Sequence, residues 1–112
     1  MKNFLFLLFI SLNSQTTSVE VVEKEVYQEL MKQDFIIIDV RTPEEYKLGF
    51  IKEAILMDYK ASDFTASVSA LDRNATYLIY CRSGNRSGKA SKIMDSLGFS
   101  KIYDLKGGYL NW

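Results

Sequence analysis

Short apolar runs alternate with segments of helical spacing from residue 18 onward. The runs are rich in β-branched and aromatic residues, as expected of strands buried on both faces of a sheet. They cover residues 35–40, 54–57, 76–81 and 101–105, with 18–22 as a candidate edge strand. Apolar residues spaced three, four or seven positions apart indicate helices near 26–31, 64–71 and 90–97. The alternation predicts an α/β fold: a small, mainly parallel five-stranded sheet covered by helices on both faces.

Local signals mark the start of a further helix and the end of the helix near 90–97. Thr42 can cap a helix that has Pro43 at its first position, and Glu45 completes a capping box. Gly98 follows the last apolar position of the segment 90–97 and predicts a helix stop there. At the carboxyl end of the sequence, a glycine pair predicts a turn before a last helix, and we expect Trp112 to pack in the core.

The first residues differ from the rest of the chain. Lys2 precedes an apolar run at residues 4 to 12, and the composition then turns polar. This pattern is similar to a short secretory signal peptide, and the run is far below the ~20 residues that a membrane-spanning helix needs. We therefore expect a signal peptide at residues 1–17, a single domain at 18–112, and export to the periplasm without stable membrane insertion. The alternative is a cytoplasmic protein in which the apolar run forms a first buried element.

Composition limits the function. A chain of 112 residues with 47% hydrophobic and 25% charged residues can bury one core. The 14 basic and 14 acidic residues give a formal charge of zero, so we expect neither nucleic acid nor an anionic membrane as a partner. One cysteine and no histidine exclude an internal disulfide, an ordinary structural zinc site and histidine-assisted catalysis. We expect no metal and no cofactor, and the oligomeric state stays open.

The only cysteine, Cys81, ends the most apolar run, and small and basic residues lead from it into the next helical segment. Ligands of open parallel sheets bind beyond the carboxyl ends of the strands. A helix N-terminus there favours an anion, and Arg82 and Arg86 add positive charge. We therefore expect the thiolate of Cys81 to be favoured, which would make it a nucleophile. The alternative is an inert cysteine that closes a core strand.

The residues between Cys81 and the helix suit a tight loop. Gly84 can adopt a positive φ, and its small neighbours Ser83 and Asn85 leave the backbone amides free to surround an anion. Ser87 can cap the helix or donate to the site. Because the chain has no histidine, Cys81 is the group expected to change charge between about pH 5 and 8.

Four motifs follow one another along the chain: IIIDVRTPEEY, GFIKEAILM, CRSGNRS at 81–87 and LKGGYLNW. In this order they resemble the motifs of the rhodanese-like sulfurtransferases, and CRSGNRS is similar to the active-site loop of that family. The resemblance covers residues 18–112. It departs at Phe50, where the family usually has histidine, and at Lys52 and Glu53, where proline and glycine are common.

The resemblance implies a single-domain thiosulfate sulfurtransferase that works in two steps. Cys81 would take a sulfur atom from a small donor such as thiosulfate, hold it as a persulfide, and pass it to cyanide or a thiol. The implied substrate-binding residues are Arg82, Ser83, Gly84, Asn85, Arg86 and Ser87. Asp39 and Arg41 would support the loop, and their alternative is an exposed ion pair at an ordinary turn. The alternative for the two loop arginines is a solvated helix start.

Two other functions are weighed against sulfur transfer. A related class of phosphatases uses Cys-x5-Arg, whereas Cys81 and Arg86 are separated by four residues and Ser87 stands where the longer loop has arginine. The spacing therefore disfavours phosphate. The second alternative is a binding module, or a sulfur carrier that works only within a complex, on the same fold. The physiological donor, the acceptor and the pathway stay open.

Overall fold

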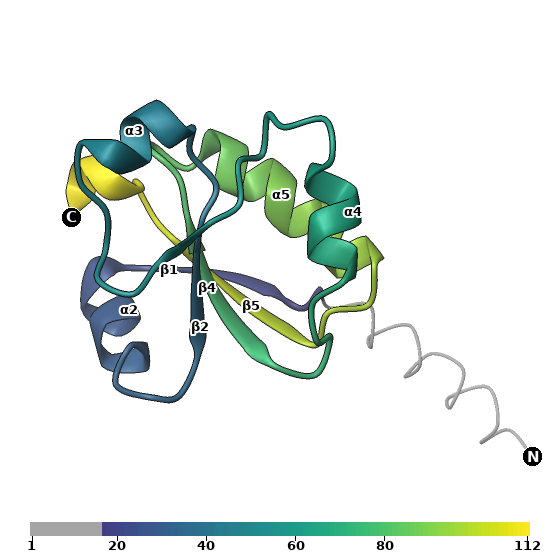
Figure 1. Cartoon of the computed structure of the whole chain (residues 1–112). Coiled ribbons are helices and arrows are strands. Elements are labelled where there is room, and N and C mark those ends of the chain that lie inside the picture. The colour runs from purple at the N-terminus through teal and green to yellow at the C-terminus, as the bar shows by residue number, and fades with distance from the viewer. Residues whose placement is uncertain (1–16) are drawn as a thin grey trace, which may run out of the picture.

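Five parallel strands form one sheet in the order β1-β5-β4-β2-β3 (Figure 1). The computed structural model describes residues 17–112. The strands are β1 (Val19–Val22), β2 (Ile36–Asp39), β3 (Ile55–Leu56), β4 (Thr76–Tyr80) and β5 (Lys101–Leu105). β1 lies at one end of this order, so the predicted edge strand is confirmed. All four strand pairs are parallel, so the sheet is wholly rather than mainly parallel. The strand expected at 54–57 is shorter, because only two residues pair with β2.

The helices lie on both faces of the sheet, as expected, and their bounds follow the predicted spacing. They are α2 (Lys24–Leu30), α3 (Pro43–Lys47), α4 (Phe64–Ser69), α5 (Asn85–Ser96) and the 3₁₀ helix η1 (Tyr109–Asn111). One core cluster joins the sheet to α4 and α5, and a second joins its other face to α2 and η1. Figure 1 shows α4 and α5 on one side of the strands and α2 on the other. α3 buries no residue completely and lies beyond the carboxyl ends of the strands.

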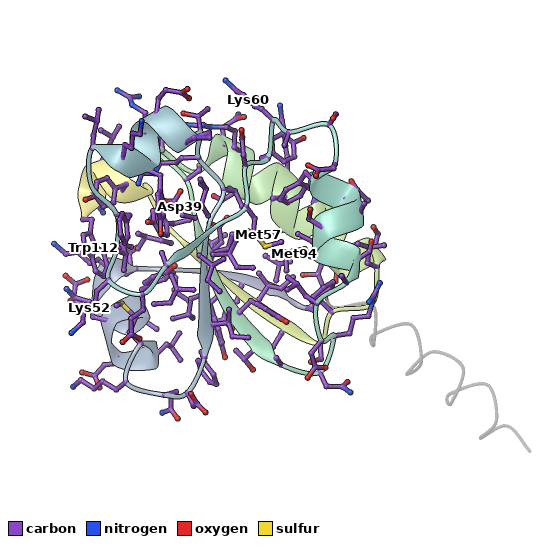
Figure 2. The ribbon with its side chains drawn as sticks, viewed as in Figure 1. Asp39, Lys52, Met57, Lys60, Met94 and Trp112 are labelled. Carbon is purple, nitrogen blue, oxygen red and sulfur yellow. The ribbon has the colours of Figure 1, made fainter. Side chains whose placement is uncertain are left out.

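The sequence signals for helix ends are confirmed. Thr42 and Glu45 form a reciprocal capping box at the start of α3, with Pro43 in its first turn. Gly98 follows α5 with a φ of +94°, a conformation that glycine adopts without steric cost. The prediction that Trp112 packs in the core is wrong, because this residue is 36% exposed. It contacts Tyr27 edge-on and lies at the rim of the molecule near α2 (Figure 2).

The turn before β3 forms although the chain departs from the family pattern there. The Ala54 N–H donates to the Ile51 carbonyl at 2.9 Å, which closes the turn. Glu53 has a φ of +71°, in the left-handed region that favours glycine. Phe50 stacks on Tyr46 with ring centroids 4.1 Å apart. The unusual residues are therefore accommodated by a strained backbone at Glu53 and by an aromatic contact.

The predicted signal peptide falls almost entirely on residues 1–16, which lie outside the described residues. Among the residues that the structure does describe, no helix is long and apolar enough to cross a membrane.

Candidate active site

Cys81 directly follows β4, the strand between β5 and β2 at the centre of the sheet. Its side chain is 1% exposed and belongs to the core cluster under α4 and α5. We call residues 81–87 the cysteine loop; it carries the chain from the end of β4 into the first turn of α5. The cysteine therefore stands where the sequence placed it, at the carboxyl end of a central parallel strand.

The cysteine loop turns back on the sulfur. Gly84 adopts a φ of +110°, and its backbone N–H donates to Cys81 Sγ at 3.1 Å. α5 begins at the next residue, and the first N–H groups of an α-helix have no acceptor within the helix. An anion at the sulfur is thus stabilised by a backbone N–H and by the dipole of a 12-residue helix. The expected role of Gly84 in the turn is confirmed.

Arg86 brings positive charge to the sulfur and is itself held by an acid. The charge of an ionised Cys81 helps to raise the pKa of Arg86, after the larger effect of Glu45. Glu45 accepts two hydrogen bonds from the guanidinium at 2.7 and 3.0 Å, and this pairing holds the pKa of Glu45 at about 2. The sequence assigned Glu45 only to the capping box. A role for Arg86 in orienting a donor stays a prediction.

The other predicted substrate-binding residues differ in exposure. Arg82, Ser83 and Asn85 are exposed, whereas Ser87 is buried. Cys81 donates its S–H to Ser87 Oγ at 3.4 Å. A groove of about 190 Å³ opens beside the cysteine loop and is lined by Arg41, Glu45, Leu48, Gly49, Arg82, Tyr109 and Leu110.

Asp39, Arg41 and Tyr80 form a buried polar network that we call the paired cluster. Arg41 donates to both carboxylate oxygens of Asp39, at 2.7 Å from its NH2 group to Oδ2 and at 3.0 Å from Nε to Oδ1. The Tyr80 hydroxyl donates to Asp39 Oδ2 at 2.6 Å and accepts from the Ile51 N–H at 3.0 Å. Asp39 and Arg41 are 0% and 4% exposed, and Figure 2 shows Asp39 in the interior below α3. The alternative of an exposed ion pair is therefore wrong.

The paired cluster reaches the cysteine loop through η1. Arg41 stacks over the Tyr109 ring at 4.3 Å from its centroid. The Tyr109 N–H donates to the Cys81 carbonyl at 2.8 Å, and the Leu110 N–H donates to the Arg82 carbonyl at 3.0 Å. A side chain at Gly108 would place its Cβ 2.4 Å from the Arg82 carbonyl oxygen, so only glycine allows η1 to approach this closely. The sequence predicted a turn at the glycines but not their contact with the loop.

A second polar group, the open cluster, lies on the opposite face of the sheet and consists of Ser87, Ser91 and Asp104. All three are buried, at 0%, 1% and 3% exposed. Ser91 Oγ and Asp104 Oδ1 have no hydrogen-bond partner among the residues that the structure describes. Burial raises the pKa of Asp104 to about 6, although its interaction with Ser87 works in the opposite direction. The sequence singled out only Ser87 of these three residues.

A family model matches this arrangement over nearly the whole described chain: the model of the rhodanese-like domain covers residues 22–112. The chain belongs to the rhodanese-like domain family. A thiosulfate sulfurtransferase of Pseudomonas fluorescens is 34% identical over 92 residues, which are 81% of this chain and 82% of that protein. The predicted resemblance is thereby confirmed.

The chain is also similar to parts of longer proteins. A tRNA uridine(34) hydroxylase of Pelagibacter ubique is 29% identical over 92% of this chain, which spans 35% of that enzyme. The crystal structure of a rhodanese-related protein from Thermoplasma volcanium superimposes with a TM-score of 0.74 at 29% identity, covering 83% of this chain and 89% of that one. The family and the fold are therefore shown, and relatives of similar length are named as sulfurtransferases.

Proposed function

We propose that this protein is a sulfurtransferase that carries a sulfur atom on Cys81. The observation that supports this most directly is the Gly84 N–H at 3.1 Å from Cys81 Sγ, at the start of α5. Backbone N–H groups fixed around a sulfur stabilise a thiolate and also the terminal sulfur of a persulfide, which is itself anionic. No side-chain base is needed for this chemistry, which suits a chain without histidine.

The reaction consists of two displacements at sulfur. The Cys81 thiolate attacks the outer sulfur of thiosulfate, the new S–S bond forms as the old one breaks, and sulfite leaves with the electron pair. Cyanide or a thiolate then attacks the terminal sulfur of the persulfide, and the Cys81 thiolate is regenerated. Arg86 lies near the reacting sulfur and Arg82 at the groove beside it, so both can attract an anionic donor.

Mass spectrometry of the purified protein before and after thiosulfate tests this function. We expect the protein to gain one sulfur atom, to lose it on addition of cyanide, and to gain none in Cys81→Ser. A matched control is Cys81→Ser/Ser100→Cys, which places a thiol at an exposed position away from the cysteine loop. Uptake by this control as fast as by the wild type would show that the loop does not activate the sulfur. A wild type that takes up no sulfur would favour the binding module.

We also propose that the protein is exported to the periplasm with loss of about the first 17 residues. The proposal rests on the change from apolar to polar composition after Leu12. N-terminal sequencing of the protein from its native host tests it. An intact Met1 on protein from the cytosol would contradict export.

A further inference from the structure

Asp104 is a buried acid that the proposed reaction does not use. It lies on β5 between Val21 of β1 and Ile79 of β4, both of which are apolar. Its side chain is at the base of a groove of about 270 Å³ between α5 and β1, lined by Thr17, Val19, Val21, Gly88, Lys92, Asp95 and Asp104. One of its oxygens, Oδ1, has no hydrogen-bond partner within the described chain. An ionised carboxylate in this position is poorly compensated.

Asp104 is connected to the reactive sulfur by a single side chain. Ser87 interacts with the Asp104 carboxyl group, and the same hydroxyl oxygen lies 3.4 Å from Cys81 Sγ. Ser87 is 0% exposed, so both contacts are shielded from bulk solvent. The order Asp104, Ser87, Cys81 therefore forms a buried polar path from the groove to the sulfur.

The direction in which the Ser87 hydroxyl points depends on the charge of Asp104. An ionised carboxylate only accepts hydrogen bonds, so it attracts the Ser87 proton and leaves the oxygen of Ser87 facing the sulfur. That arrangement is compatible with the 3.4 Å contact between Cys81 Sγ and Ser87 Oγ, and it favours the neutral thiol. A protonated Asp104 can donate to Ser87 instead, and the Ser87 proton is then free to donate to a sulfur anion.

We propose that Asp104 is a positioning residue that acts through the Ser87 hydroxyl and controls how readily the Cys81 sulfur carries a negative charge. This inference rests on the proposed function, because it concerns the same sulfur. Ionised Asp104 opposes the thiolate, and protonated Asp104 supports it. From the sequence we expect Cys81 to change charge between about pH 5 and 8, and Asp104 is not among the groups considered there. Burial raises the pKa of Asp104 to about 6, so this carboxyl group also changes charge in that range.

Among residues 17–112, few other charged groups lie near Asp104. α5 contributes Lys92 and Asp95 at the groove, and Tyr27 of α2 interacts with the carboxylate through space from the other face of the sheet. The facing residues of β1, Val19 and Val21, carry no charge. Lys92 is exposed and does not remove the desolvation that dominates at Asp104.

The test measures the rate at which a neutral reagent, iodoacetamide, alkylates Cys81 between pH 4.5 and 9.5. This readout requires a reactive thiolate but no sulfur donor, so it separates the inference from the proposed function. In Asp104→Asn we expect the midpoint to move to lower pH by roughly 0.5 to 1 pH unit, because a like charge has been removed. In the wild type, coupling between Asp104 and Cys81 should broaden the plot of alkylation rate against pH. In Asp104→Asn we expect this plot to narrow to the shape given by one titrating group. An unchanged midpoint and shape would overturn the proposal.

Two further variants keep the result specific. Asp95→Asn removes an acid from the same groove but not from the path, and we expect it to leave the alkylation midpoint unchanged. In a Ser87→Ala background, the shift caused by Asp104→Asn should fall by at least half. A full shift in that background, or an equal shift in Asp95→Asn, would contradict transmission through Ser87. If Asp104→Asn does not fold, Ser87→Ala alone should already narrow the curve toward that of one proton, and a curve as broad as that of the wild type would overturn the proposal.

Discussion

The two faces of the sheet support the cysteine loop in different ways. In the paired cluster, the buried acid Asp39 is bound by Arg41, Tyr80 and a backbone N–H. In the open cluster, the buried acid Asp104 has one oxygen without a partner. A fully bonded network fixes one geometry, whereas an incompletely bonded carboxyl can gain a proton near neutral pH. The first region therefore holds the loop in place, and the second can respond to pH.

The largest effect is expected when the paired cluster is broken. Asp39→Ala leaves the Arg41 guanidinium buried without its acid, which costs about 3 to 5 kcal/mol of unfolding free energy. Urea unfolding measures the loss. Glu20→Ala is the matched control, because Glu20 pairs with Lys101 at 3.3 Å in an exposed position, and its loss should stay below about 1 kcal/mol. Equal losses in the two variants would contradict the importance of burial.

The next largest loss of stability is expected when the contact between η1 and the cysteine loop is broken. Gly108 has a φ of +63°, and an alanine Cβ there would lie 2.4 Å from the Arg82 carbonyl oxygen. We expect Gly108→Ala to lose about 2 to 4 kcal/mol of stability and to lose sulfur uptake. Gly98→Ala is the control, because Gly98 also has a positive φ but no atom within 4 Å, so strain alone should cost about 1 kcal/mol. A Gly108→Ala protein with normal uptake would contradict the role of close approach.

Removing the acid of the open cluster should raise, rather than lower, the free energy of unfolding at neutral pH relative to the wild type. The pKa of Asp104 is raised to about 6 from the ordinary value of 3.8, so its contribution to stability is complete below about pH 4 and is lost as the pH rises through 6. The wild type should therefore lose about 1 to 3 kcal/mol between pH 4 and 8 through this group. Asp104→Asn should lack that loss. Thermal unfolding across this pH range measures it, and parallel curves for the two proteins would refute the assignment.

The smallest effect is expected at the pair of Glu45 and Arg86. Arg86 holds the pKa of Glu45 at about 2, below its ordinary value of 4.5, so the pair stabilises the fold above about pH 4.5 and less as the pH falls toward 2. Both side chains keep some solvent contact, at 26% and 17% exposed, and we expect Glu45→Gln to cost about 1 kcal/mol at pH 7. Glu44→Gln, on the exposed side of the same helix, is the control. Equal losses at pH 7 and pH 2 would contradict the ion pair.

The sequence predicted those parts of the site that depend on near neighbours. Cys81, the turn at Gly84 and the capping box of Thr42 and Glu45 all follow from spacing within a few residues. The pairing of Asp39 with Arg41 follows from their two-residue separation at the end of a strand. These features are encoded locally, so periodicity and turn chemistry are sufficient to find them.

The rest of the site depends on strand order and register, which local patterns do not contain. Glu45 reaches Arg86 across 41 residues, and Tyr80 reaches Asp39 across 41 residues as well. Asp104 stood in a weak apolar run, and nothing in that run indicated that its carboxyl group would lie under Ser87. Such residues could be recognised only after β5 was placed between β1 and β4.

The hydrogen bonds from η1 to the carbonyl groups of Cys81 and Arg82 also set the order in which the protein can mature on the ribosome. β1 pairs with β5, which joins early and late parts of the domain. The cysteine loop is closed by the N–H groups of Tyr109 and Leu110, which follow β5. Contacts so distant in sequence form slowly, and domains emerge from synthesis in order from the N-terminus. A nascent chain that ends before η1 has its cysteine but not the native closure of its loop. The reactive centre is therefore among the last parts of the domain to be assembled.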